Sequence, residues 1–337
     1  MKTKLPKVLT PQKVKEDQFL DLNLRPKRLS EFIGQEKLKK NLEIFITAAK
    51  KRNEMIEHIL FTGGPGLGKT TLALIIAEEI KAKIKIISGP AIERAGDLAA
   101  ILTSLNEGEI LFIDEIHRLN PSIEEILYPA MESYVLDLVV GKGAMAETIR
   151  IKLPRFSLIG ATTRPSLLTS PLRDRFGMIY NLDFYKEEEI EKIIARSAKI
   201  LNIKIDQSAI KEIAKRSRNT PRVANRLLKR VRDFAQVKEK EVIDQSVAKE
   251  AFELLEIDEL GLTEADRRFL KIIAEKFNGG PTGIKTLSAA LGEEEETIEE
   301  IYEPYLMRIG FLDRTPRGRV ITDLAKEYLG IKKSTLF

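Results

Sequence analysis

Cysteine is absent from this chain of 337 residues, and histidine occurs only twice, as His58 and His117. Without thiols there is no disulfide scaffold, thiolate zinc site, iron–sulfur cluster or thiol nucleophile. Two imidazoles are too few for a multi-histidine metal site. No apolar run approaches the ~20 residues that cross a bilayer, and the basic N-terminal segment lacks the apolar stretch of a secretory signal. We therefore expect a cytoplasmic protein without membrane segments.

Charge is nearly balanced overall but clustered along the chain. The net charge is +5, and 43% of residues are hydrophobic, which is typical of a globular protein with two or three domains. Between Glu191 and Lys240, 15 Lys and Arg oppose 5 Asp and Glu, and between Tyr305 and Phe337 the ratio is 7 to 3. Such clustering favours a polyanionic partner. The alternative is a solvated basic helical surface.

The apolar pattern predicts an α/β domain followed by two smaller domains. Short β-rich runs at His58–Thr62, Ile84–Ile87, Ile110–Ile113 and Phe156–Gly160 alternate with helical stretches at Leu67–Ile80, Ala95–Leu105 and Ser122–Met131. This alternation predicts a mostly parallel sheet with helices on both faces. Residues 186–256 have a helical pattern throughout. The last part of the chain has three helical segments and two short strands around Thr315–Gly318, the order of a winged helix.

A glycine-rich segment follows the first β-rich run. Its sequence is Gly63-Gly64-Pro65-Gly66-Leu67-Gly68-Lys69-Thr70-Thr71, which matches the P-loop pattern between a strand and a helix. Glycines let backbone N–H groups turn toward phosphate oxygens, and the helix N-terminus adds positive charge. Lys69 supplies a point charge for the β- and γ-phosphates, and the Thr70 hydroxyl is a ligand for Mg²⁺. The segment predicts a site for ATP and Mg²⁺.

Two further strand ends carry polar groups suited to phosphate chemistry. Asp114 and Glu115 follow the buried run Ile110–Ile113, and ligands of open α/β sheets bind at the carboxyl ends of strands. Asp114 can hold Mg²⁺ through water, and Glu115 can polarise an attacking water. Thr163 ends the run that begins at Phe156, where it can bond the γ-phosphate or that water. An ordinary strand end, with threonine present for its β-propensity, is the alternative for Thr163.

Two arginines follow in contexts that suit phosphate recognition. Arg175 lies in Pro171-Leu172-Arg173-Asp174-Arg175-Phe176. An arginine supplied across an interface stabilises transferred charge, although a surface ion pair with Asp174 is the plain alternative. Arg222 follows Thr220-Pro221 at the start of a helix in the basic region, where it could contact the γ-phosphate and report its loss.

These elements, in this order, resemble the AAA+ ATPases and among them the RuvB family, the bacterial motors that drive branch migration of Holliday junctions. The resemblance spans about Leu24 to Gly330. The motifs that carry it are Leu24-Arg25-Pro26-Lys27, Phe32-Ile33-Gly34-Gln35, Ser88-Gly89-Pro90, Asp114-Glu115-Ile116-His117-Arg118-Leu119, Leu127-Tyr128-Pro129-Ala130-Met131-Glu132, Thr220-Pro221-Arg222 and Arg314-Thr315-Pro316-Arg317-Gly318-Arg319. One departure is Gly64, where the family usually has a second proline.

The resemblance implies a role for each site residue. It makes Lys69 and Thr70 the Walker A contacts, Asp114 the Walker B metal residue, Glu115 the catalytic carboxylate, Thr163 sensor 1, Arg175 the trans arginine finger, Arg222 sensor 2, and Arg25, Ile33 and Tyr185 the adenine pocket. It also implies an N-terminal arm (residues 1–23), a large ATPase domain (24–183), a helical lid (184–257) and a winged-helix domain (258–337). The implied partners are duplex arms of Holliday junctions, a RuvA-type junction-binding protein, the RuvC resolvase and further copies in a homohexamer.

Two surfaces are candidates for those partners. Residues 134–153 have the pattern of a hairpin, and its alternating apolar residues are Leu136, Leu138, Val140, Ile149 and Ile151. The resemblance implies that this hairpin docks the RuvA-type protein, although packing on its own domain is the default for such a pattern. In the winged helix, the third helix is acidic and the wing holds Arg314, Arg317 and Arg319. We therefore expect the wing, and not that helix, to contact DNA phosphates.

Two other readings remain. One is a different AAA+ DNA machine, of the clamp-loader or initiator type. The other is a nucleotide-gated DNA-binding regulator without motor action.

Overall fold

The structure is a computed structural model, and its described residues are 23–140 and 147–331. The chain divides into two compact units. Among the described residues, one unit comprises 25–184, and the other combines 23–24 with 185–331. No described helix is long and apolar enough to cross a membrane.

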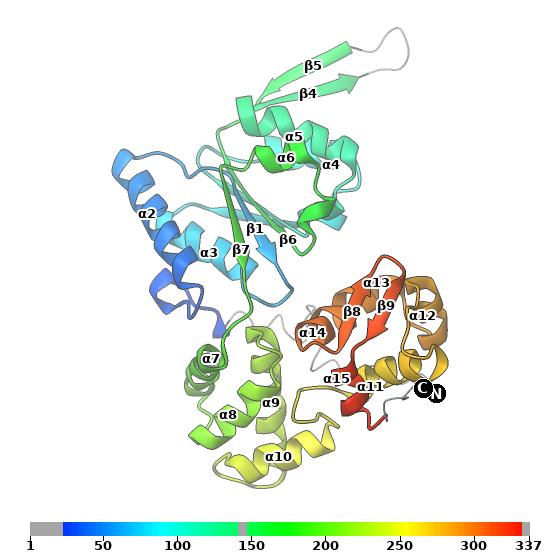
Figure 1. The fold of residues 1–337 in the computed structure, drawn as a ribbon. Helices are drawn as coiled ribbons and strands as arrows, with labels where there is room; N and C mark the ends of the chain where they lie inside the picture. The colour runs from blue at the N-terminus through cyan, green and yellow to red at the C-terminus, as the bar shows by residue number, and fades with distance from the viewer. Residues whose placement is uncertain (1–22, 141–146, 332–337) are drawn as a thin grey trace. The chain divides into compact units, whose positions relative to one another are not determined.

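The first unit is built on a five-stranded parallel sheet with the order β2-β3-β6-β1-β7 (Figure 1). The strands are β1 (Ile59–Gly63), β2 (Ile84–Ser88), β3 (Ile110–Asp114), β6 (Ser157–Thr162) and β7 (Met178–Leu182). The central strands β1, β3 and β6 are buried along nearly their whole length, as expected for strands covered on both faces. Four of the five strands were predicted from sequence.

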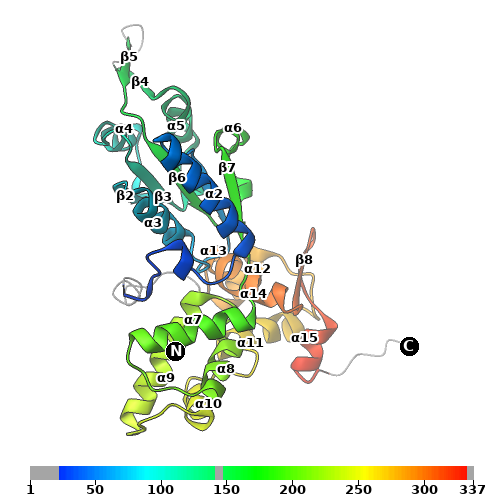
Figure 2. The same ribbon diagram turned by 90° about the vertical axis from the view of Figure 1, so that its left-hand side faces the viewer.

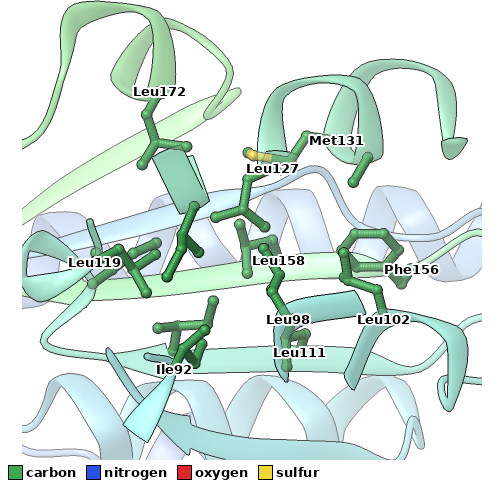
Figure 3. Packing of buried hydrophobic residues seen from close by; sticks show 14 of the residues in the cluster. Ile92, Leu98, Leu102, Leu111, Leu119, Leu127, Met131, Phe156, Leu158 and Leu172 are labelled. Carbon is green, nitrogen blue, oxygen red and sulfur yellow. The ribbon is translucent and has the colours of Figure 1, made fainter. Parts of the chain in front are cut away.

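Helices cover both faces of this sheet. α2 (Glu36–Arg52) and α3 (Lys69–Ile80) pack together on one face, and α4 (Ala95–Thr103), α5 (Pro121–Ser133) and α6 (Ser170–Asp174) cover the other (Figures 1 and 2). The second face holds an apolar core in which α4 contributes Leu98 and Leu102, and the sheet contributes Leu111 and Leu158 (Figure 3). The predicted parallel sheet between two helical layers is therefore confirmed.

A two-stranded hairpin follows α5 directly. β4 (Val135–Val140) and β5 (Glu147–Lys152) are antiparallel, with Leu136 opposite Ile151 and Leu138 opposite Ile149. The hairpin projects beyond the helices of its unit (Figures 1 and 2). The strands confirm the hairpin predicted over residues 134–153, and the segment that joins them, 141–146, lies outside the described residues.

His58 ties the base of this region to the sheet. Its Nε2 lies 3.1 Å from the carbonyl of Met131 in α5, and its Nδ1 accepts a hydrogen bond of 2.8 Å from Leu158 N in β6. Nδ1 can accept only while it carries no proton, so the structure requires a neutral ring. Burial lowers the pKa of His58 below 6.5 and favours the same neutral form.

The second unit begins with a four-helix lid. Its helices are α7 (Glu187–Ile200), α8 (Gln207–Arg216), α9 (Pro221–Val237) and α10 (Gln245–Leu254). Asp206 caps α8 through Ala209 N at 2.8 Å, and Asp244 caps α10 through Val247 N at 2.9 Å. These caps satisfy helix N–H groups that have no partner within the helix. No regular strand is found among the described residues of the lid, as its sequence predicts.

A winged helix completes this unit. Its helical segments are α11 (Glu264–Lys271) with the π-helical turn η6 (Ile272–Lys276), α12 (Ile284–Leu291), and α13 (Glu295–Thr297) with η7 (Ile298–Tyr302) and α14 (Glu303–Arg308). β8 (Leu312–Thr315) and β9 (Gly318–Ile321) form the wing, and α15 (Asp323–Tyr328) follows. The predicted three helices and two strands are all present.

A buried ion pair joins the winged helix to the lid. Arg218, in the loop before α9, pairs through Nη2 with Asp266 of α11, and the two side chains are 5% and 0% exposed. Arg218 Nε donates to the Gly261 carbonyl at 3.0 Å, and its guanidinium lies 4.9 Å from the ring centre of Tyr305. Asp266 also accepts hydrogen bonds from the backbone and hydroxyl of Thr263, which begins α11. The ion pair, the helix cap and the arginine–tyrosine contact therefore lie together at the junction between the lid and the winged helix.

Candidate nucleotide site and DNA-contact surfaces

The P-loop lies between β1 and α3, as the sequence predicts. Gly63, Gly66 and Gly68 have φ angles of 131°, 79° and 108°, a backbone region that L side chains rarely adopt. A Cβ on Gly63 would also lie 2.5 Å from the Leu182 carbonyl oxygen. The glycines are thus required by backbone conformation and by close packing against β7.

Lys69 is folded into this loop. The residue is 6% exposed, and its Nζ donates to the carbonyls of Gly63 and Gly64 at 2.8 and 2.9 Å. These two bonds hold the ammonium group within the glycine-rich turn, at the N-terminus of α3. The positive charge and the helix N-terminus therefore converge where phosphate would bind.

The ends of β3 and β6 bring oxygen groups to the same edge of the sheet. Thr70 Oγ1 lies 3.4 Å from Asp114 Oδ2, and the Thr163 hydroxyl donates to Glu115 Oε2 at 3.2 Å. Hydroxyl and carboxylate oxygens are the ligands that Mg²⁺ prefers. The structure thus brings Thr70, at the P-loop, to Asp114, and Thr163 to Glu115.

Gly89 is a residue whose importance the sequence alone does not reveal. A Cβ at this position would lie 2.4 Å from the Glu115 carbonyl oxygen. Glu115 itself has a φ of 52°, in the left-handed region, which is costly for a residue with a side chain. Gly89 therefore gives the chain room to reverse at Glu115. Its motif is visible in the sequence, but this contact arises only because β2 and β3 are neighbours.

Arg175 lies on the α5–α6 side of the first unit. Its Nη2 pairs with Glu132 at 3.0 Å, its Nη1 donates to the Pro171 carbonyl at 2.7 Å, and its guanidinium lies 4.6 Å from the ring centre of Tyr128. The sequence suggested Asp174 as an alternative ion-pair partner of Arg175, but the acidic partner in the structure is Glu132. These contacts are with α5 and α6, and not with the P-loop of the same chain.

The predicted adenine-pocket and sensor 2 residues are divided between the two units. Arg25 and Ile33 belong to the ATPase unit, where Gln35 anchors their segment through a 2.6 Å bond to the Asp183 carbonyl. Tyr185 is 2% exposed in the lid unit, where Asn219 Nδ2 donates to its carbonyl at 2.8 Å. Arg222 is the second residue of α9. The assembly of these residues into one site stays a prediction.

The three wing arginines differ sharply. Arg319 is 7% exposed at its side chain and pairs with Glu303 at 2.6 Å and Glu299 at 3.1 Å. Arg314 is 54% exposed and also reaches Glu299, at 3.2 Å. Arg317 is exposed at the wing turn. Arg319 therefore holds the wing on the acidic helix and does not present its charge to solvent as predicted, which leaves Arg314 and Arg317 as the accessible cations of the wing.

The apolar residues of the hairpin also differ from one another. Leu136 is fully buried and belongs to the core of the ATPase unit, and Ile151 packs against that core. Packing on its own domain, the default for such a pattern, thus holds at the base of the hairpin. Ile149 is 47% exposed. The side chains of Leu138 and Val140 lie outside the described set.

Comparison with protein families resolves the assignment. Residues 24–182 match the Holliday junction DNA helicase RuvB P-loop domain, residues 185–258 the RuvB AAA lid domain, and residues 259–330 the RuvB C-terminal winged helix domain. The chain belongs to the RuvB family. RuvB of Clostridium kluyveri, named as a Holliday junction branch migration complex subunit, is 58% identical over 330 residues, which are 98% of this chain and 94% of that protein.

Solved structures agree with this assignment. The RuvB Holliday junction branch migration motor of Thermotoga maritima superposes with a TM-score of 0.85 at 49% identity, covering 92% of this chain and 99% of the other. A lysine-to-arginine mutant of that protein gives the same TM-score at 50% identity. The predicted AAA+ fold, with its lid and winged helix, and the membership of the RuvB family are confirmed. As a P-loop ATPase of this family, the chain binds nucleotide.

Proposed function

We propose that the protein is an ATP-driven motor that moves the duplex arms of Holliday junctions through a ring of its own subunits, in DNA recombination and repair in the cytoplasm. The observation that carries the proposal is the convergence of Lys69, Glu115 and Thr163 at one edge of the sheet, within a chain of the RuvB family. Phosphate binding, activation of water and detection of the γ-phosphate require these groups together.

In this proposal each residue has a definite task. The P-loop N–H groups and Lys69 hold the phosphates of ATP. Thr70 and Asp114 offer oxygen ligands that fit Mg²⁺, which when bound neutralises phosphate charge. Glu115 accepts a proton from the attacking water, and the Thr163 hydroxyl orients that water. Positioning and electrostatic stabilisation supply most of the rate in phosphoryl transfer.

The arginine finger comes from the neighbouring subunit. Arg175 contacts α5 and α6 of its own chain, so a ring that places this face against the next nucleotide site lets it stabilise the transferred charge there. An arginine finger contributes a factor of roughly 10³–10⁵ to turnover. This shared site requires a neighbouring subunit, which the proposed homohexamer supplies.

Motion is transmitted through the lid. Loss of the γ-phosphate ends its contact with Arg222 at the start of α9, and Arg25, Ile33 and Tyr185 recognise the adenine. The lid then turns, and the winged helix follows because the Arg218–Asp266 pair joins them. Arg314 and Arg317 of the wing contact phosphates, which gives affinity with little sequence preference.

The partners follow from the same assignment. The exposed Ile149 on the hairpin, with Leu138 and Val140, meets a RuvA-type junction-binding protein that directs the ring onto the arms. A RuvC-type resolvase acts on the same junction. The name of the C. kluyveri relative, a subunit of a branch migration complex, supports such an assembly.

Replacing the catalytic carboxylate tests the proposal. Glu115→Gln should reduce steady-state ATP turnover to a small residual rate while nucleotide still binds, and Glu125→Gln, on the exposed side of α5, should leave turnover unchanged. The matched assay is ATP-dependent dissociation of a synthetic four-way junction with and without the RuvA-type partner. Unchanged turnover in Glu115→Gln would leave only a nucleotide-gated DNA binder.

The shared site has a separate test. Arg175→Ala subunits keep an intact nucleotide pocket, and Lys69→Ala subunits keep an intact finger. Mixing the two should restore part of the turnover that each lacks alone. If mixed rings stay inactive while each variant still assembles, the finger does not act across subunits.

A further inference from the structure

His117 is buried beside the proposed general base. The side chain of His117 is 4% exposed, and its Nδ1 lies 3.4 Å from Glu115 Oε2 and 2.9 Å from Thr162 Oγ1. A buried histidine needs a partner for each ring nitrogen, and the Thr162 hydroxyl by itself already serves Nδ1. The second contact, to the carboxylate, is what a purely structural histidine does not require.

The backbone explains how two residues so close in sequence come to face each other. Glu115 has a left-handed conformation with a φ of 52°, and the short helical turn η3 (Ile116–Arg118) begins directly after it. The chain therefore reverses, and the His117 ring returns toward both the Glu115 side chain and the end of β6. Gly89 leaves the room for this reversal.

Two contacts converge on one carboxylate oxygen. Thr163 donates to Glu115 Oε2 at 3.2 Å, and His117 Nδ1 approaches the same oxygen. The terminal torsion of a glutamate side chain is soft, so an unsupported carboxylate samples many orientations. Two neighbours on Oε2 restrict that torsion and fix the direction of the carboxylate. The Glu115 side chain remains 34% exposed, so it is held in place and still reached by solvent.

We propose that His117 is a positioning residue for ATP hydrolysis: it orients the carboxylate of Glu115 and links it, through Thr162, to the strand that carries Thr163. This inference deepens the proposed function and rests on it. Thr162 is fully buried and accepts a further bond from Arg164 N at 2.9 Å, so its hydroxyl is a fixed anchor. Displacement of a catalytic group by about 1 Å costs up to roughly a hundredfold in rate.

Three substitutions at one position separate positioning from packing. In His117→Leu the ring nitrogens are lost, and the turnover number should fall roughly ten- to hundredfold while the KM for ATP changes less than about twofold. The amide of His117→Asn reaches about where Nδ1 lies and should restore most of the turnover. The amide of His117→Gln reaches about where Nε2 lies and should not. A packing role alone would not rank Asn above Gln.

The same experiment includes a double-variant cycle. In a Glu115→Gln background, His117→Leu should lower the residual turnover less than about twofold, because the group it orients is gone. Binding of a non-hydrolysable ATP analogue and thermal melting by circular dichroism show whether each variant is folded.

Three results would overturn the positioning role. They are full turnover in His117→Leu, failure of His117→Asn to restore turnover although it folds and binds the analogue, and an undiminished His117 effect in the Glu115→Gln background. The unsubstituted protein is assayed in parallel. If it hydrolyses no ATP, the proposed function fails; if it turns over and the His117 variants match it, only the positioning role fails.

Discussion

The joint between lid and winged helix permits a quantitative prediction. Arg218→Met keeps most of the side-chain volume but removes the charge, so the Asp266 carboxylate, which is 0% exposed, is left buried without its counter-ion. Removal of one partner of a buried ion pair costs about 3–5 kcal/mol. The Arg218 backbone has a φ of 53°, but methionine meets the same restriction there as arginine. The expected loss therefore comes from the unpaired charge.

A second substitution identifies the cause. Adding Asp266→Asn removes the stranded charge and keeps an oxygen that can accept the bonds from Thr263 at the start of α11. The double variant should therefore recover most of the stability that Arg218→Met loses.

Urea unfolding followed by far-ultraviolet circular dichroism suits this measurement, since the chain has no tryptophan. Hydrogen exchange in α11 reports the local effect. The argument from buried charge is wrong if the free energy of unfolding of Arg218→Met lies within about 1 kcal/mol of that of the parent. It is also wrong if the double variant is no more stable than the single one.

Further predictions concern the turn at Glu115, the wing and His58. Gly89→Ala should lower ATP turnover, because its Cβ would meet the Glu115 carbonyl at 2.4 Å. Gly96→Ala is the control, since a Cβ at that position meets no heavy atom within 4 Å. Equal turnover in both variants would contradict the role of Gly89. Arg317→Ala should weaken binding to unrelated duplexes alike and reduce the salt slope by about one. Arg319→Met should instead lower the melting temperature, because it removes the nearer of the two arginine partners of the buried Glu303 and leaves only Arg314, at 3.7 Å. A loss of binding to one DNA sequence alone in Arg317→Ala would count against contact with phosphates. The pKa of His58 is lowered below 6.5 in the folded state. As pH falls from 6.5 toward that lowered value, the unfolded chain therefore binds more protons than the folded chain does. The free energy of unfolding should therefore decline as pH falls through this window. The urea midpoint measured above and below pH 6.5 should change less in His58→Gln than in the parent.

Much of the ATPase unit is predictable from sequence because its signals are local. β1 and β3 are apolar runs, and the P-loop has a fixed spacing. β7 was not predicted because it lies at the edge of the sheet, where Ile179 and Asn181 face solvent and no continuous apolar run forms. α2 was missed although Leu38, Leu42 and Ile46 recur at helical spacing, because its many lysines obscure the stripe.

The candidate site shows the same division between local and tertiary information. Lys69, Asp114 and Thr163 follow strands that the alternating pattern places in one parallel sheet, so their position at its carboxyl edge is predictable. The insertion of β6 between β1 and β3, which brings Thr163 to Glu115, is not implied by that pattern. The contact of His117 with Glu115 depends on a single left-handed residue, which no periodicity predicts. Arg319 was predicted to contact DNA because a basic turn favours phosphate. Its pairing with Glu299 and Glu303 arises only when the wing folds onto the acidic helix.

The strand order has a consequence for how the subunit holds together. β1, β3 and β6 are neighbours in space, yet they begin at Ile59, Ile110 and Ser157, so long stretches of chain must close before any of them can pair. The proposed nucleotide site takes groups from the ends of all three strands, so it forms only after this closure, and nucleotide at about one hundred times its Kd adds about 2.7 kcal/mol against unfolding. Bound nucleotide is therefore also expected to stabilise the fold, and the protein should unfold most easily when its site is empty.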